Sequence, residues 1–392
     1  GGTHLRHVKQ RNRRETRRNR KTRAETPHHM DPLTALGAAL VAAHFGVPLA
    51  YYAAARRWLK TPWRIKPDPA YLPAVTVAIP TYNEARHIEE KLEDVYRQDY
   101  PRYMLEIIVV DSASTDGTAE KARRWAAAHP DADVKVVEEP QRRGKAAVLN
   151  AALATARGEV FVITDADCRW PQKDAIKRAV SWLADPAVGA VTCLKKPTAD
   201  RPAGVEASYR DRYNVLRLAE SRRWAIPIFH GELAAYKTEL LRKIGGFPLD
   251  IGADDSHAAA RIALVGYRAV AAEDLWCAEA VPHNGYHKWR IRRAQHLLQH
   301  FLKTPAAEAP PPMRPILLAE KYLHLANPWL LPAAAIVLAA AATPPALDLL
   351  AAGAAALALK PYRTWTAAQL YLMAAAIRNI RSKELVWEKQ VK

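Results

Sequence analysis

Cysteine is scarce in this chain of 392 residues, which contains only Cys168, Cys193 and Cys277. No two of them form a Cys-x-x-Cys pair. An odd and sparse set of cysteines argues against a disulfide framework and indicates a reducing compartment. We therefore interpret Cys168, which directly follows two closely spaced aspartates, as a small buried residue.

Formal charge is absent from two long segments, residues 33–55 and residues 322–347. At a rise of 1.5 Å per residue, a helix over the first segment is roughly 34 Å long, which is enough to cross the hydrocarbon core of a bilayer. Residues 349–359 and 364–377 also lack formal charge but are shorter. The pattern predicts an integral membrane protein.

We expect one transmembrane helix within residues 30–60 and two, or at most three, within residues 321–380. Five Lys and Arg residues lie between positions 56 and 66. By the positive-inside rule, residues 61–287 should form a cytoplasmic domain, and the basic tail 381–392 should also be cytoplasmic. Because both flanks lie on the same side, an even number of spans should separate them, which favours three transmembrane helices in total.

Basic residues exceed acidic ones, and the formal net charge is +18 at pH 7. Residues 1–29 hold ten Lys and Arg against two Glu and almost no apolar residue, so we expect this stretch to be disordered. We interpret it as a vector-derived tag that ends before Met30; the alternative is a basic arm for nucleic acid or anionic lipid. Without it the net charge is +10, which fits an anionic membrane leaflet and implies no nucleic-acid partner.

Residues 288–320 have the pattern of amphipathic helices that lie in the membrane interface. Ile291, Ala294, Leu298 and Phe301 recur at helical spacing, and arginines occupy other parts of the circumference. An apolar stripe beside basic residues is typical of a helix whose apolar face dips into the headgroup region.

Strands and helices alternate through the predicted cytoplasmic domain. Short apolar runs predict strands at residues 75–80, 105–111, 134–137, 160–163 and 188–193. Helical patterns lie between them, at residues 84–98, from residue 116, and at residues 145–157. This order predicts an α/β fold with a mostly parallel, Rossmann-like sheet and helices on both faces.

Polar side chains follow each of these strands where it ends, and such strand ends meet at one edge of a parallel sheet. Asp165 and Asp167 continue the fourth strand, so side-chain alternation should point both the same way. Two carboxylates at that edge suit Mg²⁺ or Mn²⁺, and such a cation suits a diphosphate. For single residues such as Ser114 or Asp116, capping or turn chemistry is the simpler alternative.

Four segments resemble family 2 glycosyltransferases with the GT-A fold. They are Ile79–Glu84, Val110–Thr118, Gly144–Asn150 and Asp165–Asp167. The resemblance covers about residues 73–300. Within the family, this sequence is similar to dolichyl-phosphate mannose synthases and, with its flanking helices, to cellulose synthase-like members. It implies a GT-A catalytic domain joined to an α-helical transmembrane domain, in a minimal cellulose-synthase-like arrangement.

The resemblance also implies roles for individual residues in binding a nucleotide-diphosphate sugar. Pro80, Tyr82, Glu84 and Asp111 would hold the base and ribose, and Lys145 would meet the donor. Asp165 would face the ribose and diphosphate, Asp167 would bind the divalent metal (Mn or Mg) together with Asp165, and Arg292 would meet the diphosphate. A cation and basic groups that neutralise the leaving nucleoside diphosphate would supply electrostatic catalysis.

A later block resembles the acceptor side of the same family, with His230, Gly231 and Glu232 at its centre. Asp255 lies where cellulose synthases carry Thr-Glu-Asp, which makes it the candidate general base, with Asp254 the weaker candidate. A base would take the proton of an acceptor hydroxyl as that hydroxyl attacks the anomeric carbon, giving inversion. The alternative is that both aspartates cap the helix that follows.

One departure from the family bears on function. Processive synthases carry Gln-x-x-Arg-Trp near the interfacial helix, whereas residues 289–293 here read Trp-Arg-Ile-Arg-Arg. We therefore expect transfer of one sugar, mannose from GDP-mannose over glucose from UDP-glucose, to dolichyl or polyprenyl phosphate or to a saccharide linked to it. The alternative is a processive polysaccharide synthase that uses a UDP-sugar. No obligate protein partner is predicted.

Overall fold

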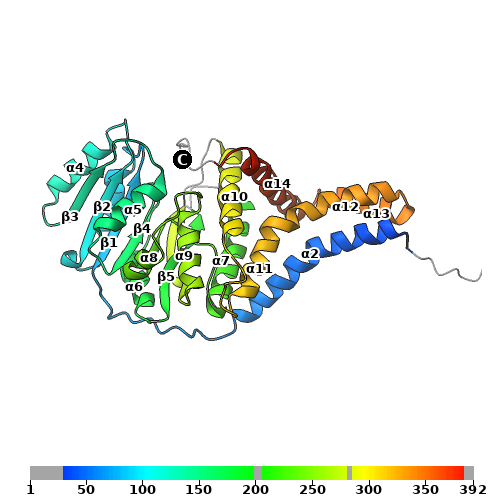
Figure 1. Ribbon diagram of the computed structural model, residues 1–392, viewed down its shortest axis with the longest axis horizontal. Helices are drawn as coiled ribbons and strands as arrows, with labels where there is room; N and C mark the ends of the chain where they lie inside the picture. The colour runs from blue at the N-terminus through cyan, green and yellow to red at the C-terminus, as the bar shows by residue number, and fades with distance from the viewer. Residues whose placement is uncertain (1–29, 198–204, 280–284, 384–392) are drawn as a thin grey trace, which may run out of the picture.

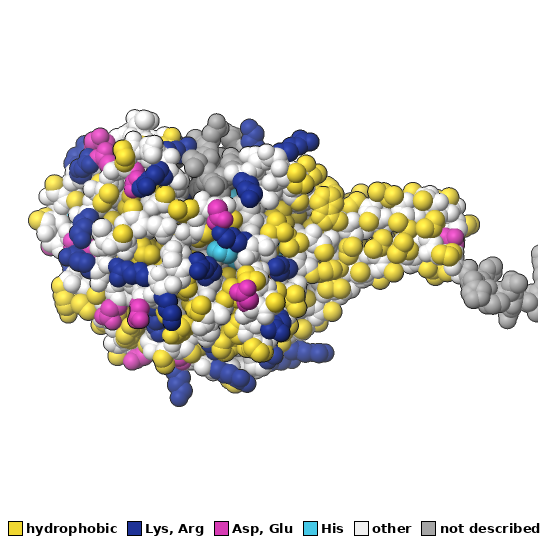
Figure 2. Space-filling view, viewed as in Figure 1, with side chains coloured by type: hydrophobic (Ala, Val, Ile, Leu, Met, Phe, Trp, Pro, Cys, Tyr) yellow, Lys and Arg dark blue, Asp and Glu magenta, His cyan; other side chains and the backbone are white. Residues whose placement is uncertain are grey.

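The computed structural model describes residues 30–197, 205–279 and 285–383, and it consists of an α/β body and an arm of helices (Figure 1). The expected disorder of residues 1–29 and the end of the basic tail lie outside the described residues. Figure 2 shows that the visible face of the arm is almost wholly hydrophobic, whereas Lys and Arg side chains gather on the body.

The body is built on a seven-stranded sheet in the order β3-β2-β1-β4-β6-β5-β7. Its strands are β1 (Val75–Thr81), β2 (Leu105–Asp111), β3 (Asp133–Glu138), β4 (Val160–Ile163), β5 (Val188–Pro197), β6 (Ala234–Lys237) and β7 (Arg268–Glu279). The α-helices are α2 (Pro32–Trp58), α3 (Ile88–Tyr96), α4 (Thr118–Ala128), α5 (Lys145–Thr155), α6 (Ala175–Leu183), α7 (Val205–Arg223), α8 (Thr238–Lys243), α9 (Asp254–Leu264), α10 (Tyr286–Lys303), α11 (Arg314–Lys321), α12 (Asn327–Ala341), α13 (Pro344–Ala356) and α14 (Lys360–Arg381). A short 3₁₀ turn, η1 (Arg102–Met104), precedes β2, and a π-helical turn, η2 (Tyr322–Ala326), joins α11 to α12.

The sheet is mostly parallel, which confirms the predicted fold class. β1 pairs in parallel with β2 and β4, and β2 pairs in parallel with β3. β6 is the exception, because it runs antiparallel to both β4 and β5. The carboxyl ends of β1, β2 and β4 therefore open at the same edge, as expected.

Alternating side chains divide the core between the two faces of the sheet. Val77 and Val162 pack on one face with α3, α4 and α6, whereas Ala78 and Phe161 pack on the other with α5, α8 and α9. All four side chains are at most 1% exposed. Because both faces carry a continuous apolar surface, helices must cover both, and this holds the strand ends rigidly in place.

The first helix after β1 begins at Ile88, four residues later than the sequence predicts. The backbone N–H groups of Asn83, Glu84 and Ala85 instead bond to side chains of the loop after β2. Those side chains are Ser114, Thr118 and Asp116. Since the N–H groups are already used outside a helix, residues 84–87 stay in a turn that ties the two strand-end loops together.

The arm contains α2, α12 and α13, with α11 and α14 where it joins the body (Figure 1). Two helices in the described residues are long and apolar enough to cross a membrane, Pro32–Trp58 and Arg314–Ala341. The second ends at Ala341, six residues before the expected end, because Ala342 adopts a left-handed φ of 51° and Thr343 caps α13. α13 and the more polar α14 then lead the chain back from the end of the arm to the body.

Polar contacts hold the helices of the arm together. His44 of α2 is fully buried, with Nδ1 3.0 Å from the Asn327 carbonyl and Nε2 accepting from Trp365 Nε1 at 2.8 Å. Thr34 and Thr343 place their hydroxyls 2.7 Å apart. Contacts between side-chain polar groups stabilise helix association where the surroundings are apolar.

α10 corresponds to the first of the predicted amphipathic helices. Leu298 and Phe301 are buried, and Gln299 Nε2 donates to Asn379 Oδ1 of α14 at 2.9 Å. The helix thus packs between the body and α14 (Figure 1). It forms one wall of the cavity described next.

Candidate active site

A cavity of about 1180 Å³ opens at the carboxyl ends of the parallel strands and continues along α10 to α2 and α14. Its volume exceeds the roughly 300–1,000 Å³ that holds one small ligand, so two reactants have room. Twelve of the thirteen residues predicted from the sequence line it: Pro80, Tyr82, Glu84, Lys145, Asp165, Asp167, His230, Gly231, Glu232, Asp254, Asp255 and Arg292. Asp111 does not.

Asp111 is buried beneath the cavity, and its carboxylate is already engaged. Oδ1 accepts from the hydroxyls of Thr81 at 2.9 Å and Ser114 at 2.5 Å, and Oδ2 accepts from the backbone N–H of Ser114 at 2.8 Å. Its geometry is therefore that of a group that orders the strand-end loop. The neighbouring Ser112 lines the cavity in its place.

Tyr82 is joined at the cavity wall by Arg142, which the sequence did not single out as a binding residue. The Arg142 guanidinium lies 3.7 Å from the centre of the Tyr82 ring, and both residues line the cavity. Gly144, two residues on, has a φ of 88°, a conformation that side-chain-bearing residues rarely adopt. The loop before α5 thereby places a cation over the ring of Tyr82 at the cavity wall.

Lys145, the first residue of α5, carries a fixed positive charge among the acidic groups. Its Nζ lies 2.6 Å from Asp165 Oδ1. Burial lowers the pKa of Lys145, but Asp165, Asp254 and Asp255 raise it by more, so the net shift is upward. The ammonium group therefore stays protonated and can hold a phosphate.

Asp165 and Asp167 both reach the cavity, although β4 ends at Ile163 and strand alternation does not set their direction. No group of three or more His, Cys, Asp or Glu suited to hold a metal ion occurs among the described residues. Two hard carboxylate donors nevertheless fit Mn²⁺ or Mg²⁺, which usually take their remaining ligands from substrate phosphates and water. The site fits a divalent cation that binds with a diphosphate and neutralises it.

Gly231 lies where the charged groups of the site converge. A β-carbon at this position would lie 3.0 Å from Lys145 Nζ, 3.3 Å from Asp255 Oδ2 and 3.7 Å from Asp165 Oδ2. The backbone here has no positive φ, so conformation does not require glycine. The absence of a side chain instead keeps open the space between the donor-binding groups and the candidate base.

Asp255 lies in the first turn of α9, with Asp254 beside it, and neither is the N-cap residue, which is Ala253. Asp255 Oδ1 accepts from the backbone N–H of Ser256 at 2.6 Å. The pKa of Asp255 is raised to about 7, first by burial and then by the charge of Asp254, while Lys145 opposes both. A carboxylate that gains a proton near neutral pH has the property of a general base.

Glu232 joins the acceptor block to the sheet through both its side chain and its backbone. Its carboxylate forms a buried ion pair with Lys195 at 2.7 Å. Its carbonyl accepts from Trp170 Nε1 and from Thr164 Oγ1, each at 2.9 Å. Cys168 is buried and free, as the sequence predicts, and also bonds this carbonyl.

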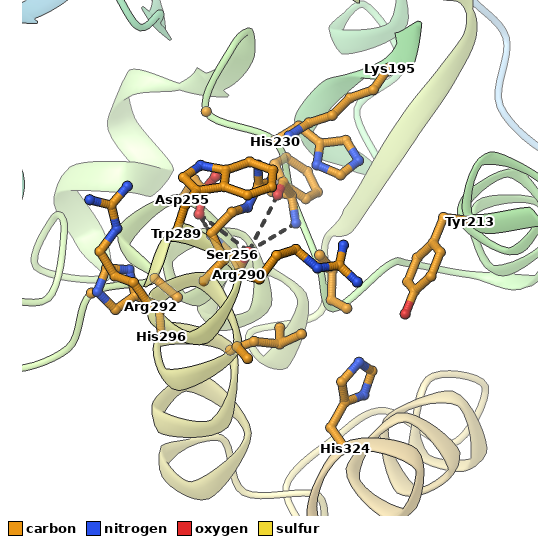
Figure 3. Close-up of a pocket in the computed structure, with 18 of the residues that line it drawn as sticks. Lys195, Tyr213, His230, Asp255, Ser256, Trp289, Arg290, Arg292, His296 and His324 are labelled. Atoms are coloured by element: carbon orange, nitrogen blue, oxygen red, sulfur yellow. Dashed lines mark hydrogen bonds between the residues drawn. The ribbon is translucent and has the colours of Figure 1, made fainter. Parts of the chain in front are cut away.

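α10 adds residues that sequence reasoning missed. Figure 3 shows Trp289 beside Asp255, with Arg292 and His296 directed to one side of the helix and Arg290 to the other. Tyr213 of α7 and His324 of η2 face Arg290 across the cavity (Figure 3). Helical periodicity shows that Arg290 and Arg292 diverge, but no sequence signal brings Tyr213 or His324 to this wall, because they come from distant helices.

Comparison with known proteins shows the family to which the chain belongs. The family model described as Glycosyl transferase family 2 matches residues 76–245. The solved mannosyltransferase PcManGT from Pyrobaculum calidifontis, in complex with GDP-Man and Mn²⁺, is 61% identical, and the superposition has a TM-score of 0.81 and covers 89% of this chain and 99% of that one.

Two curated relatives are more distant. The glycosyltransferase AglE of Haloferax volcanii is 29% identical over 238 residues, 59% of this chain and 75% of that protein. The dolichol-phosphate mannosyltransferase of Pyrococcus furiosus is 34% identical over 117 residues, 29% of this chain and 32% of that protein.

The mostly parallel sheet, with a cavity at its strand ends lined by two aspartates, a lysine and a candidate base, is that of a GT-A glycosyltransferase. The chain belongs to glycosyltransferase family 2.

Proposed function

We propose that this enzyme transfers mannose from GDP-mannose to dolichyl or polyprenyl phosphate, or to a saccharide linked to that lipid phosphate, with inversion at the anomeric carbon. The observation that carries the proposal is 61% identity, over almost the whole of both chains, to a mannosyltransferase solved with GDP-Man and Mn²⁺. Similarity to a dolichol-phosphate mannosyltransferase supports the lipid acceptor.

The donor is proposed to bind along the strand ends. Tyr82, with Pro80 and Glu84, holds the base and ribose, supported by the Arg142 stack. Asp165 and Asp167 hold the cation, and Lys145 and Arg292 neutralise the diphosphate. This places negative charge where the structure supplies positive charge, and the leaving GDP gains charge as its bond to the sugar breaks.

The acceptor is proposed to enter from the opposite side of Gly231, beside Asp255. The acceptor oxygen forms its bond to the anomeric carbon as the bond from that carbon to the diphosphate oxygen breaks. For a hydroxyl acceptor, the proton goes to Asp255 and the electron pair of the breaking bond leaves with GDP. A phosphate monoester is already ionised at neutral pH and needs no base.

Membrane attachment is also part of the proposal. α2, the helix Arg314–Ala341 and the return path of α13 and α14 form three spans, and the basic residues that follow α2 keep the catalytic domain on the cytoplasmic face. The cavity wall includes Phe45 and Leu49 of α2. An isoprenoid chain can therefore reach the site from the bilayer.

The test is transfer of labelled sugar to lipid by detergent-solubilised enzyme with Mn²⁺ and dolichyl phosphate. We expect label from GDP-mannose, and not from UDP-glucose, to enter the organic phase, and this transfer to be lost with EDTA or in Asp167→Asn. Transfer from UDP-glucose alone would contradict the donor assignment. A ladder of water-soluble products would instead support a processive synthase.

A further inference from the structure

α10 presents two arginines to opposite sides of the cavity. Arg290 and Arg292 are two residues apart, which on an α-helix corresponds to roughly 200° around the axis. Figure 3 shows the Arg292 guanidinium on the side of His296, and the Arg290 guanidinium extending the other way, toward Tyr213. The helix thus presents one arginine to each of two sides of the same cavity.

On the Arg290 side, the cavity is lined by aromatic and polar side chains of several helices. Tyr213 and His324 face the guanidinium across the cavity (Figure 3). The ring of Tyr371 in α14 lies 5.4 Å from it, and the Tyr371 hydroxyl lies 2.5 Å from His287 Nδ1. These contacts fix α14 and α10 relative to each other and leave Arg290 at the cavity surface.

The charge on the Arg290 side of the cavity favours binding of an anion. Among the described residues that α2, α7, α11, η2 and α14 add to the cavity wall, Glu320 is the acidic one. Its Oε1 accepts from Arg217 Nη2 at 2.7 Å, and both side chains are 1% exposed. The negative charge of Glu320 is therefore already offset within the wall, and Arg290, together with Lys360 of α14, gives this side of the cavity its positive character.

The cavity also extends along α2 and α14, whose share of its wall is mainly apolar apart from Lys360, Thr364 and Gln369. Its lining there includes Phe45 and Leu49 of α2, Leu323 of η2, and Ala368 and Leu372 of α14. Leu49 is 67% exposed, so the cavity is open along α2. A ligand that matches this order of surfaces has an anionic group at one end and a long apolar chain at the other.

We propose that Arg290 binds the phosphate group of the lipid acceptor, on the side of the cavity opposite to the one where Arg292 faces the donor diphosphate. The proposal rests on the proposed function, because it assigns the acceptor side of the same reaction. A planar guanidinium offers paired donors to phosphate oxygens, and Tyr213 and His324 can supply further donors. The apolar groove then holds the isoprenoid chain.

The test compares two variants that remove the same group from the same helix. Arg290→Ala should raise the KM for dolichyl phosphate at least about tenfold, the loss expected for one charge-assisted hydrogen bond, with the affinity for GDP within about twofold of wild type. Arg292→Ala should weaken GDP binding and raise the KM for GDP-mannose. Arg290→Lys keeps the charge and should fall between Arg290→Ala and wild type.

Inorganic phosphate separates recognition of the head group from recognition of the chain. Inhibition by inorganic phosphate that is competitive with dolichyl phosphate in wild type, and is lost in Arg290→Ala, would show that the phosphate group alone is bound there. If inorganic phosphate does not compete but Arg290→Ala still raises the KM for dolichyl phosphate, binding at this site also requires the apolar groove. The proposal is overturned if Arg290→Ala, with an unchanged melting temperature, leaves the KM for the acceptor unchanged. It is also overturned if Arg290→Ala weakens GDP binding by as large a factor as it raises the KM for the acceptor. Failure of the proposed function would appear in wild type, as no sugar transferred to lipid.

Discussion

At the scale of single residues, the candidate base is the group on which the chemistry turns. Asp255→Asn keeps the shape of the side chain but cannot accept a proton, so transfer to a hydroxyl acceptor should fall by about 10²-fold or more. Binding of GDP, measured by calorimetry, should be preserved, because the donor groups lie across Gly231.

The matched control is Asp250→Asn, the same chemical change on an exposed aspartate that pairs with Lys303 outside the cavity. It should retain wild-type transfer. Near-normal transfer by Asp255→Asn would show that this carboxylate only organises the first turn of α9.

Asp255 also predicts the pH dependence of the reaction. Its pKa is raised to about 7 by burial and by Asp254, and the base must be unprotonated to act. Values of kcat/KM for a hydroxyl acceptor should rise about tenfold per pH unit below 7 and level off above it. The residual activity of Asp255→Asn should lack this inflection; an unchanged profile would assign it to another group.

The stability contribution of Asp255 has the opposite sign. A carboxyl whose pKa is higher in the folded than in the unfolded state contributes stability that is present below the unfolded value and lost as pH rises through the folded value. Between about pH 4 and pH 7 the enzyme should therefore gain activity and lose part of its stability through the same group.

Gly231 predicts a steric limit on the sugar. Gly231→Ala places a methyl group 3.0 Å from Lys145 Nζ and 3.3 Å from Asp255 Oδ2, in the space proposed for the sugar, so mannose transfer should fall by about tenfold, equivalent to about 1.4 kcal/mol. In this variant, the rate of transfer from a GDP-sugar that lacks one hydroxyl should fall by a smaller factor than the rate of transfer from GDP-mannose.

The control for this change is Gly46→Ala, because a β-carbon at Gly46 meets no atom within 4 Å. It should leave transfer and sugar preference unchanged. Equal losses for every donor in Gly231→Ala would indicate a general distortion of the loop and contradict a role in sugar selection.

The sequence predicted most of this site and missed one side of it. Lys145 and Asp165 follow strands whose order was readable, so their convergence could be inferred, whereas Asp255 was placed by its resemblance to the family. Arg142 lies in the same loop as Lys145, but its stacking on Tyr82 depends on how that loop packs, and the place of Tyr213 depends on how α7 packs against the sheet.

At the scale of secondary-structure elements, a buried ion network joins three helices. Arg217 of α7 donates to Glu220 at 2.8 Å and to Glu320 of α11 at 2.7 Å, and Tyr51 of α2 donates to Glu220 at 2.5 Å. Burial raises the pKa of Glu220 well above its usual range, although Arg217 opposes this. The network holds α2 and α11 against the body.

Arg217→Leu should destabilise the protein by about 3–5 kcal/mol, because it leaves two carboxyl groups buried without their cation. The fall in melting temperature should be larger at pH 8 than at pH 5, since the carboxyl groups can take up protons at the lower pH. Arg223→Leu, on an exposed position of the same helix, should change it little. Equal melting temperatures for both variants would contradict the role of the network.

Element boundaries show where sequence reasoning works and where it stops. β2 spans Leu105–Asp111 as predicted, because an apolar run fully buried on both faces has distinct ends. The antiparallel β6 was not predicted, since Ala234–Lys237 is four residues long and carries no strand periodicity. The end of α12 was missed because Ala342 has no sequence feature that requires its left-handed conformation.

At the scale of the whole molecule, the direction of the arm predicts membrane topology. The three native cysteines are buried, so thiol labelling of the wild type should be weak. A cysteine placed at Asp348 in α13, near the end of the arm, should react from the side of the membrane opposite to one placed at Lys66, beside the body. Labelling of both from one side would contradict three spans.

The Arg217 network has a further consequence for how this enzyme can be divided. Tyr51 belongs to the first apolar helix, yet its hydroxyl completes the hydrogen bonds of a carboxyl group inside the catalytic body. This helix is therefore not a detachable module. A truncated enzyme that starts after residue 60 would expose Glu220 and open the cavity wall, and replacing α2 with an unrelated apolar helix would do the same. Modularity, common among membrane-tethered enzymes, is absent at this junction.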